Sequence, residues 1–187
     1  MHLNNRFLEF YKVILILNKN FTVYKFISGN GMMHELIIKK LETIEETKEC
    51  AAIMLDSNPW KRLNFSYDLC FKSFNEELAE FYILTKNDIV IGFVSIQMEG
   101  AFTGYIKRIC IKRNWRGKGI GSKLMGFAEQ RIFSKKHNVF LCVSSLNKKA
   151  KKLYLKLGYE IIGEINDYIV PDSKELILRK SRGPMLS

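Results

Sequence analysis

Three glycines, at positions 117, 119 and 121, alternate with other residues in the segment RNWRGKGIGSKL. A strand-like run, TGYIKRICIK, precedes them, and a segment with the apolar spacing of a helix follows. The apolar positions of that helix are Ile120, Leu124, Phe127, Ala128 and Ile132. Glycine lets the backbone turn sharply, and free N–H groups at a helix start bind anions. The segment therefore predicts a phosphate-binding turn between a strand and a helix, although a simple tight turn fits the glycines as well.

The spacing of the loop argues against two common nucleotide sites. A Walker loop ends in Gly-Lys-Ser or Gly-Lys-Thr, whereas Gly121 is followed by Ser122 and Lys123 in the opposite order. A dinucleotide site needs an acidic residue about twenty positions later, whereas the next apolar run ends in Ser144 and Ser145.

The order of expected elements predicts an α+β (mixed α/β) domain around one sheet. Thr43 and Glu46 form a capping-box pattern at the start of the first helix, and Gly158 is placed to end the last one. Asn87 and Asp88 predict a hairpin turn. The short apolar run 139–144 is typical of a strand buried on both faces. The expected strands are 34–41, 80–86, 89–98, 103–112, 139–144, 159–165 and 175–180, and the expected helices are 43–58, 66–74, one after the loop and one near 147–157.

Positive charge is concentrated in one part of the chain. Residues 105–156 contain fifteen Lys or Arg and one acid, Glu129, whereas the remaining residues sum to −3 within a total of +11. This indicates an anionic ligand, such as a polyphosphate, a nucleic acid or an acidic protein, or simply a solvated basic surface.

The N-terminal segment differs from the rest. We expect residues 1–31 to form a tail or an upstream extension outside the fold. Residues 32–181 should form the domain, and residues 182–187 a C-terminal tail. The apolar run in KVILILNKNF is too short to span a membrane, and no contact with a membrane is expected. The four cysteines show no CxxC pair or dense framework, which favours free thiols and a cytoplasmic location.

Two motifs carry a resemblance to a known family. The run ICIKRNWRGKGIGSKLM resembles the acetyl-CoA loop of the GNAT superfamily of N-acetyltransferases, with Arg116, Gly119 and Gly121 at its fixed positions. The later run NKKAKKLYLKLGY resembles the second signature of that family. The matching positions there are Asn147, Ala150, Tyr154, Lys156, Gly158 and Tyr159. The resemblance covers about four fifths of the chain, from Glu35 to Lys180, since the order of elements also agrees.

This resemblance implies a GNAT-like acyl-CoA N-acyltransferase fold, with a central, mostly antiparallel, splayed sheet of about seven strands flanked by about four helices. It implies acetyl-CoA as co-substrate, with the pyrophosphate on the backbone amides of the loop and the pantetheine arm along a strand edge. Arg113 and Lys123 are further candidates for phosphate contact. The implied coenzyme-binding residues are Ile109, Cys110, Ile111, Arg116, Gly117, Lys118, Gly119, Ile120, Gly121, Ser122, Asn147 and Tyr154.

By the same resemblance, Tyr154 donates a proton to the CoA thiolate, and a backbone amide at Ile109 stabilises the oxyanion. Members that acetylate an N-terminal alanine of a ribosomal protein carry a glutamate where this chain has Cys142, which we interpret as a packing residue. Glu99 is the substitute candidate for the general base, and deprotonation through water is the alternative.

The sequence does not identify the acceptor amine, and the candidates range from a small amine to a protein N-terminus. Trp60 is either a candidate to line the pocket of the acceptor amine or an ordinary core residue. His34 and His137 have no recognisable partners in the sequence. No metal site is expected. The competing hypothesis is a non-catalytic CoA-binding or nucleic-acid-binding regulatory protein, nucleic acid being the less favoured partner. The oligomeric state stays open, a homodimer included.

Overall fold

The computed structural model of the chain describes residues 14–17, 21–27 and 33–185. Its strands are β1 (Ile14–Leu17), β2 (Phe21–Ile27), β3 (Met33–Lys40), β4 (Ala79–Lys86), β5 (Ile89–Gln97), β6 (Tyr105–Ile111), β7 (Asn138–Ser144), β8 (Glu160–Asn166) and β9 (Lys174–Ser181). Its helices are α1 (Ile44–Leu55), α2 (Tyr67–Lys72), α3 (Ile120–Phe133) and α4 (Lys148–Lys156), with a short 3₁₀ helix, η1 (Arg113–Trp115).

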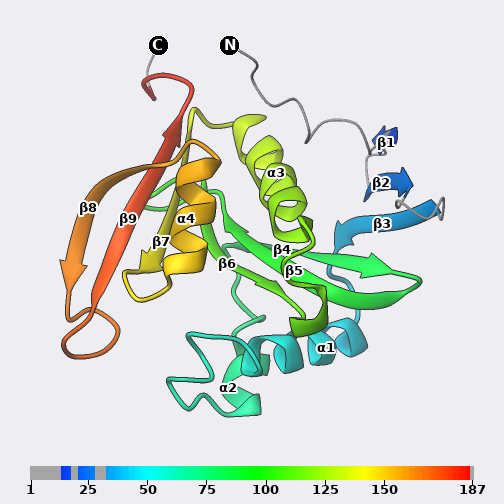
Figure 1. Cartoon of the computed structure of the whole chain (residues 1–187), viewed down its shortest axis with the longest axis horizontal. Helices are drawn as coiled ribbons and strands as arrows, with labels where there is room; N and C mark the ends of the chain where they lie inside the picture. Colours follow the sequence, from blue (N-terminus) through cyan, green and yellow to red (C-terminus); the bar gives the residue numbers. More distant parts are fainter. Residues whose placement is uncertain (1–13, 18–20, 28–32, 186–187) are drawn as a thin grey trace, which may run out of the picture.

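The strands form one sheet in the order β1-β2-β3-β4-β5-β6-β7-β9-β8 (Figure 1). Neighbouring strands are antiparallel except β6 and β7, which are parallel. The predicted α+β class and the mostly antiparallel sheet with four α-helices are therefore confirmed. The sheet has nine strands rather than about seven.

The two additional strands, β1 and β2, fall within the segment that the sequence analysis assigned to a tail. The sequence of β2, FTVYKFI, is rich in aromatic and β-branched residues, which favour a strand. β2 pairs with β3 along its whole length, and Val23 and Tyr24 are buried. The sheet thus extends across the expected boundary at residue 32, whereas the other end of the expected domain coincides with the end of β9 at Ser181.

Local signals in the sequence set the ends of several elements. Thr43 and Glu46 form the predicted capping box at the start of α1. Asn87 and Asp88 have φ angles of 47° and 62° in the β4–β5 turn, and Gly158 has a φ of 87° after α4. These positive values explain why short polar residues and glycine occupy the turns.

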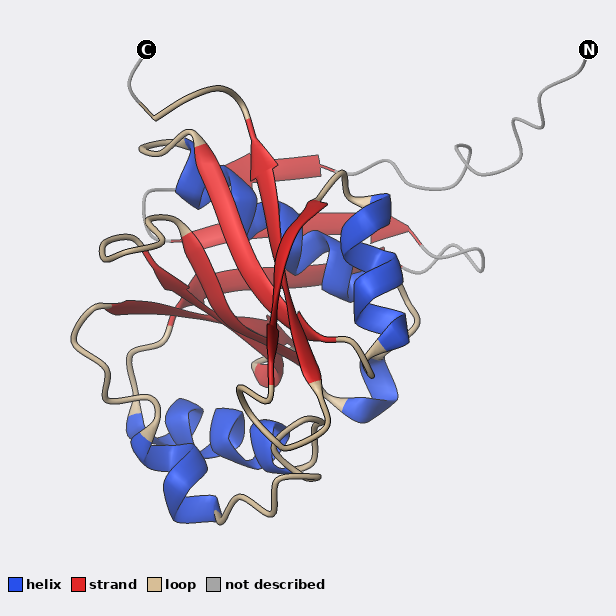
Figure 2. Ribbon diagram, turned by 90° about the vertical axis from the view of Figure 1, so that its left-hand side faces the viewer, coloured by secondary structure: helices blue, strands red, loops and turns tan. Residues whose placement is uncertain are grey.

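Helices cover both faces of the sheet. One cluster of buried side chains lies beneath α3 and α4, with members such as Leu124, Tyr154 and Leu178. A second cluster, with members such as Cys50 and Phe93, lies beneath α1 and α2. Figure 2 shows these two helices and the α3 and α4 pair on opposite sides of the sheet. β7 alternates between buried and half-buried residues, so the expectation that it is buried on both faces is wrong. Its odd-numbered residues face α3 and α4, and Cys142 faces the other side.

Candidate active site

β6 and β7 separate along their length. They pair only through Tyr105 with Phe140 and Ile106 with Leu141, yet β6 continues to Ile111 and β7 to Ser144. Because the two strands are parallel, both of their carboxyl ends lie at the open end of the splay. The glycine loop and α3 follow β6 there, and α4 follows β7. Beyond Ile106, the edge of β6 that faces β7 pairs with no strand of the described chain.

The glycine loop presents its backbone to open space. Gly117 and Gly119 have φ angles of 76° and 73°, in the left-handed region that favours glycine. A Cβ atom added at either position would meet no atom within 4 Å. Gly119 precedes α3, and no side chain caps that end of the helix. The first amides of α3 therefore point out of the helix without an internal acceptor, as an anion site requires.

Gly121 lies where β6, α3 and α4 meet. A Cβ atom added there would lie 3.9 Å from a methyl carbon of Leu153 on α4 and 4.0 Å from Ile111 on β6, both ordinary contact distances. The structure thus brings together the strand end, the loop and the helix that carries Tyr154.

Arg116 joins the loop to two other parts of the fold. Its Nε donates to the Ile111 carbonyl at 2.7 Å, and its guanidinium donates to the Ser57 hydroxyl, also at 2.7 Å. The Ser57 hydroxyl donates in turn to the carbonyl of Ile53 at the end of α1. The guanidinium therefore fixes the strand–loop junction against α1, a role that the sequence analysis did not assign to it.

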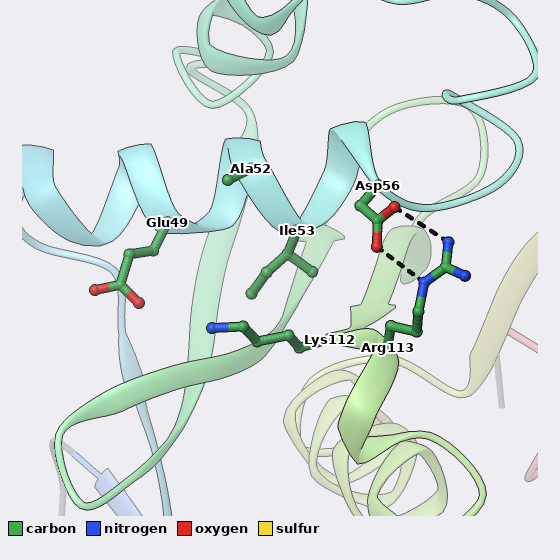
Figure 3. A pocket seen from close by; sticks show the side chains of 6 residues that line it. All are labelled: Glu49, Ala52, Ile53, Asp56, Lys112 and Arg113. Carbon is green, nitrogen blue, oxygen red and sulfur yellow. Dashed lines mark hydrogen bonds and ion pairs between the residues drawn. The ribbon is translucent and has the colours of Figure 1, made fainter.

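Arg113, the other arginine predicted to contact phosphate, also has a protein partner. Both of its bonds to the Asp56 carboxylate measure 3.2 Å, and the pair is exposed at one side of a cavity of about 170 Å³ (Figure 3). Arg113 and Lys61 together hold the pKa of Asp56 below its usual value. The cavity lies between α1 and the residues after β6, and Tyr154 does not line it.

Lysines surround the loop. The Nζ atoms of Lys118 and Lys86 lie 5.1 and 4.9 Å from the centre of the Trp115 ring, within the range of cation–π attraction. Lys123 lies 5.7 Å from the Tyr24 ring, and partial burial lowers the pKa of its ammonium. β2 therefore contributes to the surroundings of the first turn of α3.

Tyr154 is buried on α4, with its ring 6.0 Å from the ring of Tyr159. Burial raises the pKa of Tyr154 to about 12, and the nearby Cys110 of β6 adds a smaller effect in the same direction. The phenol therefore stays protonated at neutral pH, as a proton donor must. Asn147 caps α4 by accepting from the Ala150 amide at 3.2 Å.

Cys110 directs its thiol away from the splay, into the cluster beneath α1 and α2. Burial raises the pKa of this thiol to about 12, although its interaction with the Ser57 hydroxyl opposes the shift. Trp60 packs half-buried against the same cluster, and His137 is exposed. The side chain of His34 lies outside the described residues.

Glu99 does not join this group. Gln97, at the end of β5, pairs with Tyr105 at the start of β6, so Glu99 lies beyond the closed end of the splay. Its carboxylate forms a 2.9 Å ion pair with Lys136, and the Glu99 side chain is 68% exposed. The structure therefore does not bring Glu99, the predicted substitute base, together with the glycine loop and Tyr154, because the sequence did not reveal at which end of β6 the residue would lie.

Cys142 belongs to a cluster on the face opposite α3 and α4, together with Tyr105 and Glu175. Burial raises the pKa of the Cys142 thiol, and the Tyr105 hydroxyl beside it opposes that shift through a hydrogen bond. Glu175 lies opposite Ser144 across the β7–β9 pair and interacts electrostatically with both Cys142 and Tyr105. Sequence reasoning missed Glu175, although the alternation of ELILRK places it on the same face as Ile177.

Within the described part of the chain, no three His, Cys, Asp or Glu side chains group as metal ligands would. None of the helices there has the length and apolar character needed to cross a bilayer.

Comparison with known proteins agrees with this geometry. Residues 35–159 match the acetyltransferase (GNAT) family. N-acetylaspartate synthetase of Danio rerio is 31% identical over 96 residues, which are 49% of this chain and 33% of that protein. The match therefore spans about a third of the length of this relative.

Solved structures share the fold. The ribosomal-protein-S18-alanine N-acetyltransferase from Escherichia coli superposes with a TM-score of 0.65 at 18% identity, covering 81% of this chain and 98% of that one. An aminoglycoside 6′-N-acetyltransferase complexed with coenzyme A gives a TM-score of 0.65 at 13% identity, covering 80% of this chain and 99% of that one.

Proposed function

Because the chain belongs to the acetyltransferase (GNAT) family, we propose that it transfers the acetyl group of acetyl-CoA to a primary amine, which attacks the thioester directly in a ternary complex. One observation carries the proposal. Two parallel strands separate after two residue pairs, and the glycine loop and the buried Tyr154 both lie at the open end.

The residues at this end suit coenzyme A. Its pyrophosphate and 3′-phosphate are anions, and the backbone amides from Gly117 to Ser122 offer donors on an uncapped helix start. The lysines around Trp115 add positive charge. The free edge of β6, at Ile109 to Ile111, offers main-chain groups to the amides of the pantetheine arm, as an added strand would use them. Arg116 supports this surface by holding the Ile111 carbonyl, and it stays a candidate for contact with the coenzyme.

Acetyl transfer needs an uncharged amine, a donor for the oxyanion and a proton for the departing thiolate. The amide of Ile109 is the donor that we assign to the oxyanion. Tyr154 supplies the proton to the sulfur, because its phenol is protonated and lies near Cys110 of β6. Asn147 positions α4, and with it Tyr154, through its cap.

The acceptor is a primary amine of a small molecule or a protein N-terminus. The names of the related proteins give three starting points: an aminoglycoside, an alanine of a ribosomal protein and aspartate. All four cysteines are free thiols, which is compatible with the cytoplasmic location that we propose. A homodimer stays a proposal that size-exclusion chromatography with light scattering tests.

Two measurements test the function. Calorimetry should show binding of acetyl-CoA in the micromolar range. Thiol release should then be measured with kanamycin, an alanine-initiated peptide, L-aspartate and spermidine. Absence of acetyl-CoA binding overturns the proposal, and a salt-steep affinity for RNA in its place supports the regulatory alternative.

A further inference from the structure

We propose that Glu175 of β9 is the general base that takes a proton from the acceptor ammonium. This inference rests on the proposed acetyl transfer and assigns a role in it that neither motif of the sequence indicates. Three observations support it: the strand register, the side of the sheet that is open to an acceptor, and the contrast between Glu175 and two ion-paired carboxylates on that side.

The acceptor must reach the splay from the face opposite α3 and α4. On the near face, α4 lies against the first turn of α3 and the end of β6, through Leu153, Gly121 and Ile111. Tyr154 is buried within the same packed layer. An amine therefore has access to the thioester carbon only from the face that carries Cys142 and Glu175.

The register brings Glu175 to the open end on that face. Ser144, the last residue of β7, pairs with Glu175, and Cys142 pairs with Ile177. Cys142 and Glu175 are thus diagonal neighbours, about 7–8 Å apart by the geometry of an antiparallel pair. The carboxylate interacts electrostatically with Cys142 of β7 and with Tyr105 of β6, so it lies on the same face of the sheet as these two side chains.

Two other carboxylates near this face, those of Glu76 and Asp56, are already neutralised by cations. Glu76 forms ion pairs with Lys107, at 2.8 Å, and with Arg108. Although partial burial opposes ionisation, these two cations hold the pKa of Glu76 below its usual value. Asp56 is paired with Arg113 and Lys61. Each of these acids resists protonation because its negative charge is stabilised, so each is a poor base.

Glu175 has the opposite character. Within the described residues, no Lys or Arg forms an ion pair with it, and burial raises its pKa against a smaller effect of the Ser144 hydroxyl. Tyr105 and Cys142 face it as neutral groups, and Tyr168 of the β8–β9 loop interacts with Tyr105. On β9 itself, Lys174 pairs with Glu164. Arg179 on the same face is four residues away, about 13 Å along a strand.

The proposed step is balanced. The Glu175 carboxylate accepts one proton from the ammonium and later releases it to solvent, and the free amine forms the C–N bond to the acetyl carbon. As the C–S bond breaks, Tyr154 gives its proton to the sulfur, and the nitrogen loses its second proton, which restores the phenol. The products are the acetylated amine, the CoA thiol and one proton.

The test compares Glu175→Gln with Glu160→Gln, a control on exposed β8, across a pH series. The acceptors are the best ammonium-type amine of the four named above and hydroxylamine, which is uncharged at neutral pH. With the ammonium-type amine, we expect Glu175→Gln to reduce kcat about 10²-fold at pH 7 and to lose the acidic limb of its pH profile. With hydroxylamine the enzyme-dependent rate should change little, and acetyl-CoA affinity and the unfolding midpoint should match those of the control.

A merely structural role of Glu175 would lower the rates with both nucleophiles alike, and that result overturns the inference. A wild-type pH profile in Glu175→Gln overturns it as well, while leaving the proposed function intact. Failure of the wild-type protein to bind acetyl-CoA overturns both proposals together.

Discussion

The glycine loop contains two positions, Gly119 and Gly121, at which the same substitution should have opposite effects. Gly119 has a φ of 73°, and an added Cβ would meet no atom within 4 Å. Gly119→Ala should therefore lower the free energy of unfolding only through the strain of placing alanine in the left-handed region, which is about 1–2 kcal/mol. At a scale of about 2–4 °C per kcal/mol for a chain of this size, we expect the unfolding midpoint to fall by about 2–8 °C.

Gly121 is the second residue of α3, and its φ lies outside the strained positive range. The added Cβ would make ordinary contacts with Leu153 and Ile111, at 3.9 and 4.0 Å. Alanine in a helix is favoured over glycine by about 0.5–1 kcal/mol, so Gly121→Ala should raise the midpoint by about 1–4 °C.

Urea unfolding followed by circular dichroism, without ligand, measures both free energies of unfolding. Calorimetry with acetyl-CoA adds a second reading, because the strained loop of Gly119→Ala should turn its amides away and weaken binding. A Gly119→Ala protein as stable as the wild type would refute the reasoning about φ. A Gly121→Ala protein destabilised by more than about 1 kcal/mol would show that the packing at the junction tolerates no methyl group.

Three further predictions follow from the site and from α1. Tyr154→Phe should lower kcat by about 10²-fold or more while the Kd for acetyl-CoA stays within twofold, since the hydroxyl is needed only as the C–S bond breaks; equal losses in both would mark a packing role. Asn147→Ala should lower the free energy of unfolding by about 1 kcal/mol through loss of the α4 cap, and Asn147→Asp should retain most of it; an unchanged urea midpoint in Asn147→Ala would contradict the cap. Although partial burial opposes ionisation of Glu46, its ion pair with Lys39 and its backbone hydrogen bonds, including that from Thr43, hold its pKa below the usual value. The ionised Glu46 carboxylate stabilises the fold fully above its unfolded pKa, about 4.3, and this contribution is lost as the pH falls through its folded pKa. Glu46→Gln should therefore lower the free energy of unfolding at pH 7 and much less at pH 3.

The features predicted correctly are those that short segments encode. The capping box at Thr43, the positive φ angles of Asn87 and Asp88 and the glycine after α4 each depend on residues within a few positions of one another. The order of strands and helices followed from such signals. The splay of β6 and β7 followed from the resemblance alone, since no pattern in either strand states how far the two remain paired.

The partners of the arginines could not be predicted, because they are distant in the sequence. Arg113 binds Asp56 and Arg116 binds Ser57, which lie 57 and 59 positions earlier. From the sequence alone, a cation beside a glycine loop suggests a phosphate ligand. Only the fold shows that an acid and a hydroxyl near the end of α1 lie beside these two arginines. Both arginines thus connect the end of α1 to the segment of the glycine loop.

The positions of Glu99 and Glu175 relative to the splay could not be predicted from the sequence, for a common reason. A residue beyond the end of β5 seemed close to β6 in the sequence, but antiparallel pairing of Gln97 with Tyr105 sends it to the closed end of the splay. Glu175 lies 33 residues after Cys142 and reaches it only because β9 enters the sheet antiparallel to β7, with Ser144 opposite Glu175. A shift of one residue in this register would turn Glu175 toward the α3 and α4 layer, where a carboxylate without a partner is strongly disfavoured. The register that buries Leu176 and Leu178 therefore also fixes the carboxylate at the open end, where an ammonium would meet it.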